Sequence, residues 1–319
     1  MKRLIGIIAG FLLIITCSSW GFFAHYRINR LAVFTLPKQM AGFYKANIEF
    51  ITEHATSADK RRYVDSTEAP KHYLNADHYD KNPFARIPQR WADAVVKYSE
   101  DTLIANGTVP WTINYNYYKL VDAFKAKDTS GILTASANLG HYVADAHVPL
   151  HLTTNYDGKL TNQPGMHAFW ESRLPELFAD QYHYNAGKAH YIQNPLAEAF
   201  KICRVSFSEV DTVLRFERIL DKQFPADKKY ITEKRGKKMV KDYSVEYSLA
   251  YQKMMKGMVE RRMRAAILSV GSYWYSAWID AGQPDLNKLI DKPLAGDELK
   301  KVQQEEALFK VGKVLVLAK

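Results

Sequence analysis

Helical periodicity is the feature that most constrains how this chain of 319 residues can fold. Apolar residues recur at intervals of three and four along most of the sequence, a pattern typical of helices that bury one face. No run of four to eight strictly alternating residues is convincing enough to predict a strand. The sequence therefore predicts an all-α fold, with helices over Phe22 to Phe34, Lys38 to Glu53, Leu196 to Phe224 and Tyr243 to Asp280.

The remaining segments fit between these helices. The polar stretch from Thr56 to Pro88 contains three prolines and predicts loops and short turns. No repeat or linker divides the chain, so residues 20–319 are predicted to form one domain, with the motifs in 20–171 and a helical remainder in 172–319. Further helices are expected over Gln89 to Ile104, Tyr115 to Lys127 and Asp297 to Phe309, and from a cap at Thr129 or Ser130 to near His147.

The first nineteen residues have the form of an export signal. A positively charged start, Met1-Lys2-Arg3, precedes the mainly apolar stretch from Leu4 to Thr16, and Cys17-Ser18-Ser19 supplies the small residues of a cleavage site. The apolar stretch is too short to span a bilayer, which takes about 20 residues. We therefore expect cleavage after Ser19 and a periplasmic or secreted protein. Lipidation of Cys17 is the weaker alternative, because Thr16 is a poor residue before a lipidated cysteine.

Charge and cysteine content limit how the chain can be stabilised and which substrates suit it. Loss of Lys2 and Arg3 with the signal lowers the net charge from +10 to +8, and loss of Cys17 leaves Cys203 alone, which excludes an internal disulfide. An exported chain without disulfides depends on its core or on metal for stability. Hydrophobic residues make up 47% of the chain, enough for a substantial core. The basic balance suits an anionic substrate, although Lys and Arg look spread along the chain rather than clustered.

Histidines and carboxylates concentrate in two short segments. His141 and Asp145 stand four residues apart on a predicted helix, a spacing that puts both side chains on one face with Cβ atoms roughly 5–6 Å apart. His167 and Glu171 repeat this spacing, and His151 lies between the two pairs. Imidazole nitrogen and carboxylate oxygen are ligands that zinc prefers. The two segments therefore predict a zinc site.

The spacing alone carries little weight. Ten histidines and 34 acidic residues give about one His-x-x-x-acid pair by chance, and most such pairs are surface contacts, whereas this chain has two. The joint pattern is stronger evidence than either pair. Pro149 forces Val148 out of helical geometry, so the helix stops and His151 can turn towards either pair.

The joint pattern resembles the signature of zinc-dependent phospholipases C and of the related single-strand-specific nucleases. The similarity runs from Trp20 to about Glu171, half of the chain, and all nine ligand positions hold residues of the right type. The matching pieces are Trp20-Gly21-x-x-x-His25, Ala58-Asp59-x-x-Arg62, Pro70-Lys71-His72-Tyr73, His141-x-x-x-Asp145-x-x-x-Pro149-Leu150-His151 and His167-x-x-x-Glu171.

This resemblance implies a helical fold around three zinc ions. A deprotonated α-amine is a good nitrogen ligand, which accounts for a cleavage site placed immediately before a tryptophan. The ligands implied by the resemblance are Asp59, His72, His141 and Asp145 for one zinc, His151, His167 and Glu171 for a second, and the amino group and carbonyl of Trp20 with His25 and a bridging Asp145 for a third.

The resemblance also implies roles in the hydrolysis of a phosphate ester by water that zinc activates. Asp59 would orient that water or take a proton from it while binding zinc. Arg62 would bind the negative phosphoryl oxygens. His147 fits the nuclease form of the motif and is expected to support a ligand from behind.

The sequence leaves the substrate open. The start at Trp20, the basic Arg62 and the positive charge favour a nuclease acting on single-stranded DNA or RNA. Glu171 resembles the phospholipases, because the nucleases usually have Asp there. The Gly-Gly-Asn segment of the nucleases is also missing, with Asn155 or Asn162 as a candidate replacement. A phospholipase C is therefore the alternative, and an exported zinc-binding protein without catalysis is the alternative of another class.

Overall fold

The computed structural model describes residues 22–235 and 238–315. Helices dominate it, and the described residues form only one sheet of two strands, so the predicted all-α class is confirmed. The expected export signal (residues 1–19) and Trp20 lie outside the described residues. None of the described helices is both long enough and apolar enough to cross a membrane.

Short connections join the helices, and one hairpin interrupts them. The α-helices are α1 (Phe22–Ala32), α2 (Lys38–Ala46), α3 (Ile48–Glu53), α4 (Ser57–Arg61), α5 (Trp91–Tyr98), α6 (Glu100–Ala105), α7 (Val109–Ala126), α8 (Thr129–Ala146), α9 (Met166–Ala168), α10 (Leu174–Phe178), α11 (Pro195–Gln223), α12 (Val245–Met254), α13 (Met258–Asp280) and α14 (Gly296–Lys310). The strands are β1 (Tyr230–Arg235) and β2 (Lys238–Tyr243). The short turns that shape the site are the 3-10 turns η2 (His54–Thr56), η3 (Ala69–His72) and η6 (Pro149–Leu152) and the π-helical turn η8 (Phe169–Arg173).

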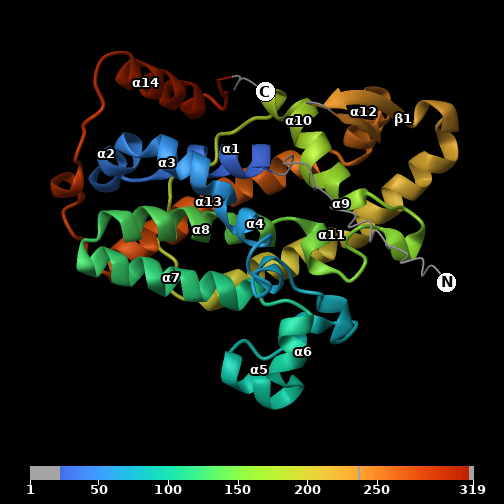
Figure 1. The fold of residues 1–319 in the computed structure, drawn as a ribbon, viewed down its shortest axis with the longest axis horizontal. Coiled ribbons are helices and arrows are strands. Elements are labelled where there is room, and N and C mark those ends of the chain that lie inside the picture. The colour runs from blue at the N-terminus through green and yellow to red at the C-terminus, as the bar shows by residue number, and fades with distance from the viewer. Residues whose placement is uncertain (1–21, 236–237, 316–319) are drawn as a thin grey trace, which may run out of the picture.

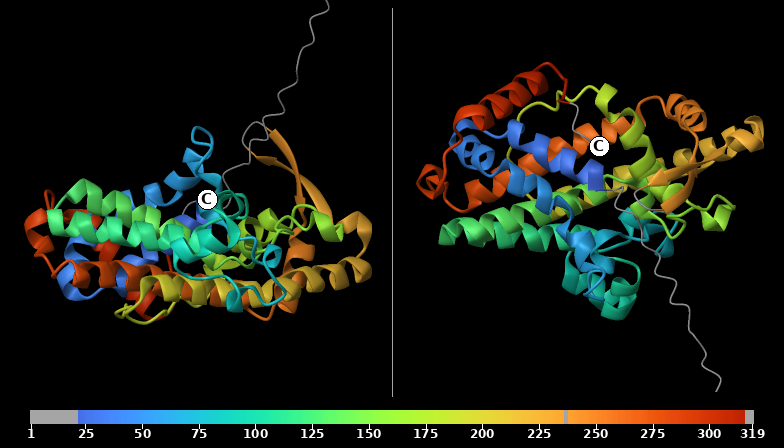
Figure 2. Two further views of the ribbon diagram at one scale, coloured as in Figure 1. Left: turned by 90° about the horizontal axis from the view of Figure 1, so that it is seen from below. Right: turned by 45° about the horizontal axis from the view of Figure 1, so that its top comes forward.

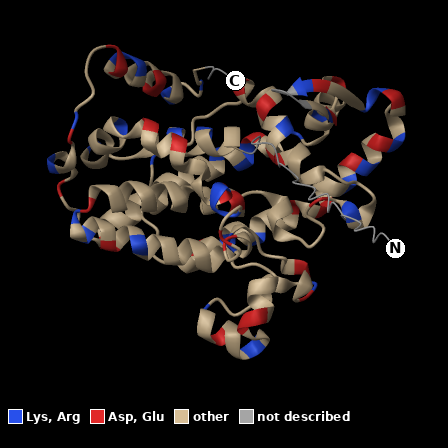
Figure 3. Cartoon of the chain, viewed as in Figure 1, with Lys and Arg blue, Asp and Glu red and all other residues tan. Residues whose placement is uncertain are grey.

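Helix α8 lies at the centre of the fold. It packs against α1, α7, α11 and α13, and these helices run roughly along the long axis of the molecule (Figure 1). Helices α5 and α6 project from one edge, and α14 covers the opposite edge (Figure 1). Charged residues lie mainly on the peripheral elements, whereas α7 and α8 are largely uncharged (Figure 3). An apolar helix surrounded by other helices is therefore the scaffold of the site.

The start of α8 differs from the expected cap. Asp128 has extended backbone angles, and its carboxylate accepts a hydrogen bond from the backbone N–H of Gly131 at 3.0 Å. Thr129 and Ser130, which we expected to cap the helix, are already helical. The cap is thus one residue earlier than predicted, because the cap is the last non-helical residue whose side chain can reach back to a free N–H.

Close packing of α8 against α1 fixes its position. Gly140 faces Asn29 of α1, and a Cβ atom at Gly140 would lie 2.2 Å from the side-chain oxygen of Asn29. Asn29 also donates from Nδ2 to the carbonyl of Ala137 at 3.2 Å. At the other end the helix stops at Ala146, and Val148 is extended before Pro149, as the sequence predicts. The packing and the stop together set which residues face the site.

Most of the other predicted helices are present, and the main error is that three of them were predicted as continuous. The segments α1, α11 and α14 agree with expectation, apart from one or two residues at their ends, whereas α7 begins at Val109, six residues before the predicted start at Tyr115. Three predicted continuous helices are each divided in two. The breaks fall at Asn47, at Ser99 with φ 67° and at Gly257 with φ 75°. Residues with positive φ, such as Ser99 and Gly257, cannot continue a right-handed helix.

The hairpin was not predicted. Strands β1 and β2 pair antiparallel with Tyr230 opposite Tyr243 and Arg235 opposite Lys238. Its sequence lacks an alternation of apolar and polar residues, because the two faces are both mixed: Glu233 and Asp242 share one face with Ile231 and Val240, and Met239 shares the other with Thr232, Lys234 and Lys241. The signal in the sequence is Gly236 followed by Lys237, because a glycine in first place is common in two-residue hairpin loops.

Candidate metal centre

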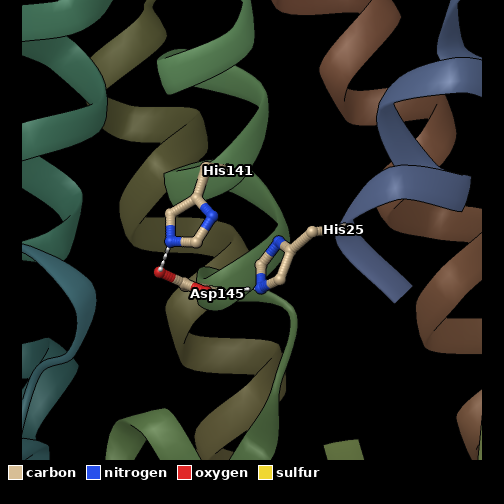
Figure 4. Close-up of side chains that lie close together, drawn as sticks. All are labelled: His25, His141 and Asp145. Carbon is tan, nitrogen blue, oxygen red and sulfur yellow. Dashed lines mark ion pairs between the residues drawn. The ribbon is translucent and has the colours of Figure 1, made fainter. Parts of the chain in front are cut away.

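Helix α8 contributes two of the predicted ligands, one turn apart. The Nε2 atom of His141 lies 3.3 Å from Oδ2 of Asp145. The other oxygen, Oδ1, lies 3.4 Å from Nε2 of His25 on α1. Figure 4 shows the two imidazoles approaching Asp145 from different sides. The two oxygens of one carboxylate therefore face two separate positions, as a bridging ligand requires.

The first group consists of Asp59, His72, His141 and Asp145. Nδ1 of His72 lies 2.9 Å from Oδ2 of Asp145 and 3.0 Å from Nε2 of His141. Asp59, on α4, completes the group from its more open side, with Oδ1 3.7 Å from Nε2 of His141 and 3.8 Å from Nδ1 of His72. Three segments that lie far apart in the sequence thus present four ligand atoms to one point.

The second group consists of His151, His167 and Glu171. Oε2 of Glu171 lies 2.7 Å from Nε2 of His167 and 3.3 Å from Nε2 of His151, and the two nitrogens are 3.0 Å apart. His151 comes from the turn η6, which begins at Pro149 shortly after α8 ends at Ala146. His167 is on α9 and Glu171 is on the π-helical turn η8. π-helical turns are rare and are frequent at functional sites.

His25 lies between the two groups. Its Nε2 atom is 3.4 Å from Asp145 in the first group and 3.3 Å from Oε1 of Glu171 in the second. The sequence predicted the contact to Asp145 but not the one to Glu171. Both carboxylates are therefore shared, and His25 connects the groups into one centre. Trp20, the ninth predicted ligand, lies outside the described residues.

The distances suit a divalent cation. Ligands about 2.0–2.2 Å from a tetrahedral ion are roughly 3.3–3.6 Å apart. The neighbouring imidazole nitrogens and carboxylate oxygens of the two groups and of His25 are separated by 2.7 to 3.8 Å. Three sets of ligand atoms each fit within 4.8 Å, namely His25, His141 and Asp145; Asp59, His72 and His141; and His151, His167 and Glu171. These buried histidine and carboxylate clusters can hold metal ions.

The carboxylates control the charge of the centre. Burial by itself lowers the pKa of His151, but the negative charges of Asp145 and Glu171 outweigh burial and raise this pKa to about 9. Burial raises the pKa of Asp145, yet His141 and His151 hold it well below its ordinary value. A cluster that attracts protons this strongly attracts a divalent cation for the same electrostatic reason.

Two histidines are oriented by backbone carbonyls. Nδ1 of His141 donates to the carbonyl of Ala55 in η2 at 2.8 Å, and Nδ1 of His151 donates to the carbonyl of His72 at 2.6 Å. Each bond leaves Nε2 free and facing the cluster. A fixed second nitrogen is the usual support of a metal-binding histidine, because it sets both the tautomer and the ring orientation.

His72 has a different support, which the sequence analysis missed. Oε1 of the buried Glu68 lies 3.5 Å from Nε2 of His72. This separation is at the long limit of a hydrogen bond, so the attraction is mainly electrostatic. Glu68 also accepts hydrogen bonds from the Tyr142 hydroxyl and from Arg61 and Lys71, the last two at 3.2 and 2.9 Å.

This network holds Glu68 in the charged form. Burial raises its pKa, but the contacts to His72, Lys71, Tyr142 and Arg61 outweigh burial and leave the pKa well below its usual range. Glu68 therefore presents a fixed negative charge to the nitrogen of His72 that faces away from the cluster. The signal in the sequence was the four-residue spacing from Glu68 to His72.

Arg62 and His147 lie differently from the ligands. Arg62 is about half exposed, and its Nη1 atom is 3.8 Å from Asp59 on the open side of the first group. His147 is buried and turned elsewhere, since its ring bonds the carbonyl of Val143 at 2.7 Å and the hydroxyl of Ser269 at 3.3 Å. Burial lowers the pKa of His147 to about 3. The expected support of a ligand by His147 is therefore wrong.

No known family model matches this chain, and no curated protein matches it. The assignment of the centre therefore rests on the residues and their geometry.

Proposed function

We propose that this protein is an exported zinc-dependent phosphodiesterase, and more specifically a nuclease of the single-strand type. The observation that carries the proposal is the convergence of eight ligand residues into overlapping groups that share Asp145 and Glu171. Storage or scavenging of zinc needs no such shared carboxylates, whereas phosphate ester hydrolysis uses neighbouring ions that act on one phosphate. Nitrogen and carboxylate donors without any thiolate suit zinc.

Zinc bound in these groups would polarise a phosphoryl oxygen and lower the pKa of water towards about 7. The residues of the chain act around that chemistry. Asp59 is the most exposed member of the first group and can orient water or accept its proton on the open side. Arg62, beside Asp59, can bind a phosphoryl oxygen through its guanidinium. The buried His72 and His141 exclude bulk water from behind.

An exposed aromatic ring beside the second group favours nucleic acid as the substrate. The ring of Tyr156 is about half exposed and packs edge-on against His167, with the centroids 5.7 Å apart. Bases of every kind can stack on such a ring, whereas among phospholipid head groups only a quaternary ammonium such as choline makes a comparable contact, by cation–π attraction.

The loop before His167 excludes one of the two roles proposed from the sequence, that of Asn155. The side chain of Asn155 is buried and is used within the loop, because it donates to Thr161 at 2.9 Å and accepts from the backbone N–H of Leu160 at 2.8 Å. Asn155 therefore stabilises the loop and is not available as the polar group that replaces the missing Gly-Gly-Asn segment. Nuclease activity does not depend on Asn155 in this proposal.

One assay separates the candidate functions. Mature protein is incubated with single-stranded DNA, RNA, a 3′-nucleotide and phosphatidylcholine, with and without a chelator, and metal is counted in the same sample. We expect cleavage of the nucleic acids that a chelator abolishes and zinc restores. Cleavage of phosphatidylcholine alone would establish the phospholipase alternative. Bound zinc without hydrolysis of any substrate would establish the non-catalytic alternative.

A further inference from the structure

The outer part of the hairpin is strongly basic. From Lys234 to Lys241 the sequence contains five basic residues and no acidic one, so the basic residues are clustered here, contrary to the sequence analysis. Pairing of Thr232 with Lys241 and of Lys234 with Met239 puts these four side chains on one face, and all four are exposed. We call these four residues the hairpin face.

Acidic residues at the base of the hairpin are already used. Glu233 lies 3.1 Å and Asp242 lies 3.6 Å from Arg173, so both face the body of the protein. No carboxylate of the described residues forms an ion pair with Lys234 or Lys241. The ammonium of Lys241 instead lies 4.1 Å from the centroid of the Tyr230 ring. The positive charge of the hairpin face is therefore not neutralised within this part of the chain.

The hairpin is fixed to the segment that carries a metal ligand. Arg173, which holds Glu233 and Asp242, is two residues after Glu171 on the turn η8. Two residues before Glu171, the ring of Phe169 stacks on Tyr243 at 3.9 Å between centroids. The hairpin projects from the same side of the helical body as the segment that follows α4, near Asp59 (Figure 2, left). The base of the hairpin is thus anchored next to Glu171 of the second group.

We propose that the hairpin face binds the phosphate backbone of a single-stranded nucleic acid outside the nucleotide that is cleaved. The inference rests on the proposed function, because it assigns a second contact to the same substrate. Lys234 and Lys241 are diagonal neighbours, roughly 7–8 Å apart, so their flexible side chains can reach different phosphates of one strand. Met239 is the one apolar side chain of the face, which is too little for a protein partner or a bilayer.

Binding of phosphates by the two lysines predicts a defined change in the salt dependence of affinity. Each phosphate contact on a single strand adds about 0.7 to the slope of log affinity against log salt, so removal of both lysines lowers the slope by roughly 1.4. A short substrate that ends at the metal centre does not reach the hairpin. Affinity for long strands should therefore fall while turnover of a dinucleotide stays unchanged.

The test uses the whole mature protein with zinc. The double variant Lys234→Gln and Lys241→Gln is compared with Lys300→Gln and Lys301→Gln, which removes the same charge from α14 at another edge of the molecule. Fluorescence anisotropy measures binding of a 20-nucleotide DNA strand over a range of salt concentrations, and initial rates measure cleavage of a dinucleotide. We expect about tenfold weaker binding of the long strand by the hairpin variant and no change in the control.

The failures of the two proposals are distinguishable. Unchanged binding of the 20-nucleotide strand, or an equal loss in the α14 control, would overturn the role of the hairpin face, whatever the activity. An equal loss of dinucleotide cleavage would also overturn it, because the hairpin would then act on the centre. Strong binding to vesicles that contain phosphatidylglycerol, lost in the hairpin variant, would replace the nucleic acid by a membrane surface. Absence of all hydrolysis by the wild type would reject the proposed function alone.

Discussion

The two ligand groups of the centre are built from different kinds of backbone. In the first group, His141 and Asp145 stand on the regular, buried helix α8, and Glu68 supports His72 from behind. In the second group, His167 and Glu171 stand on a one-turn helix and a π-helical turn, with side chains 28% and 12% exposed. Regular backbone fixes and shields one group, whereas irregular backbone opens the other to solvent. Under the proposed function, substrate would therefore approach from the second group and the Asp59 side.

Removal of Asp145 should have the largest effect on metal content and activity, because it leaves only one of the two ligand groups intact. The variant Asp145→Ala removes a ligand from the first group and from the site of His25, and leaves only the second group intact. We expect metal content to fall to about one ion and activity to fall by more than about a hundredfold, beyond the effect of a supporting residue. Metal analysis and initial rates measure both, and circular dichroism checks the fold. Retention of full metal content would refute the bridging role.

An additional residue before Trp20 should have the next largest effect. The extension prevents the α-amine from binding metal, so we expect one ion to be lost and activity to fall by about tenfold or more. The lost ion should be the one next to His25, and the second group should keep its metal. Mass spectrometry of the mature N-terminus, followed by a metal count of both forms, provides the measurement. Equal zinc content and equal rates would show that the terminus is no ligand.

Glu68→Gln sharpens the comparison, since Glu68 supports only the first group. Loss of the negative charge next to Nε2 of His72 should weaken metal binding there by roughly 10- to 100-fold. Competition with a chromogenic chelator measures this affinity independently of activity. Lys71→Met is the comparison variant: it removes one of the contacts that keep Glu68 charged but leaves the carboxylate beside His72, so a smaller loss of affinity is expected. Weakening of the second group instead would contradict the assignment.

A smaller effect is the pH dependence of stability that His151 of the second group causes in the metal-free protein. The folded-state pKa of His151 is raised to about 9, above an unfolded value of about 6.5. Its contribution to stability is therefore fully present below pH 6.5 and is lost as the pH rises through 9, by a few kcal/mol at most. His72 and His141 of the first group contribute in the same direction, because neighbouring carboxylates outweigh burial and raise their pKa values too, whereas carboxylates with lowered pKa values do not titrate in this range. Chemical denaturation of metal-free protein between pH 6.5 and 9.5 should show the decline, and zinc should suppress it. A flat profile without metal would contradict it.

Much of the fold and centre follows from local sequence. The periodicity predicts the helices because one apolar face repeats every 3.6 residues, and Pro149 predicts the end of α8 because it restricts Val148. That His141 and Asp145 share one face of α8 follows from their spacing. The hairpin did not follow, because its stability comes from Arg173 and Phe169, which lie some sixty or more residues earlier. His147 was assigned wrongly, because the motif does not specify which way a buried ring turns.

The sequence by itself determined the class of the fold, because helical periodicity depends on residues within a few positions of one another. The resemblance of its motifs supplied the types and the order of the candidate ligands. Only the tertiary structure decided that His25 touches both Asp145 and Glu171, that Glu68 supports His72, and which face of the hairpin is exposed. The reason is physical. Such contacts depend on how α1, α8 and η8 pack, and packing is a cooperative property of the whole core that spacing in the sequence does not encode.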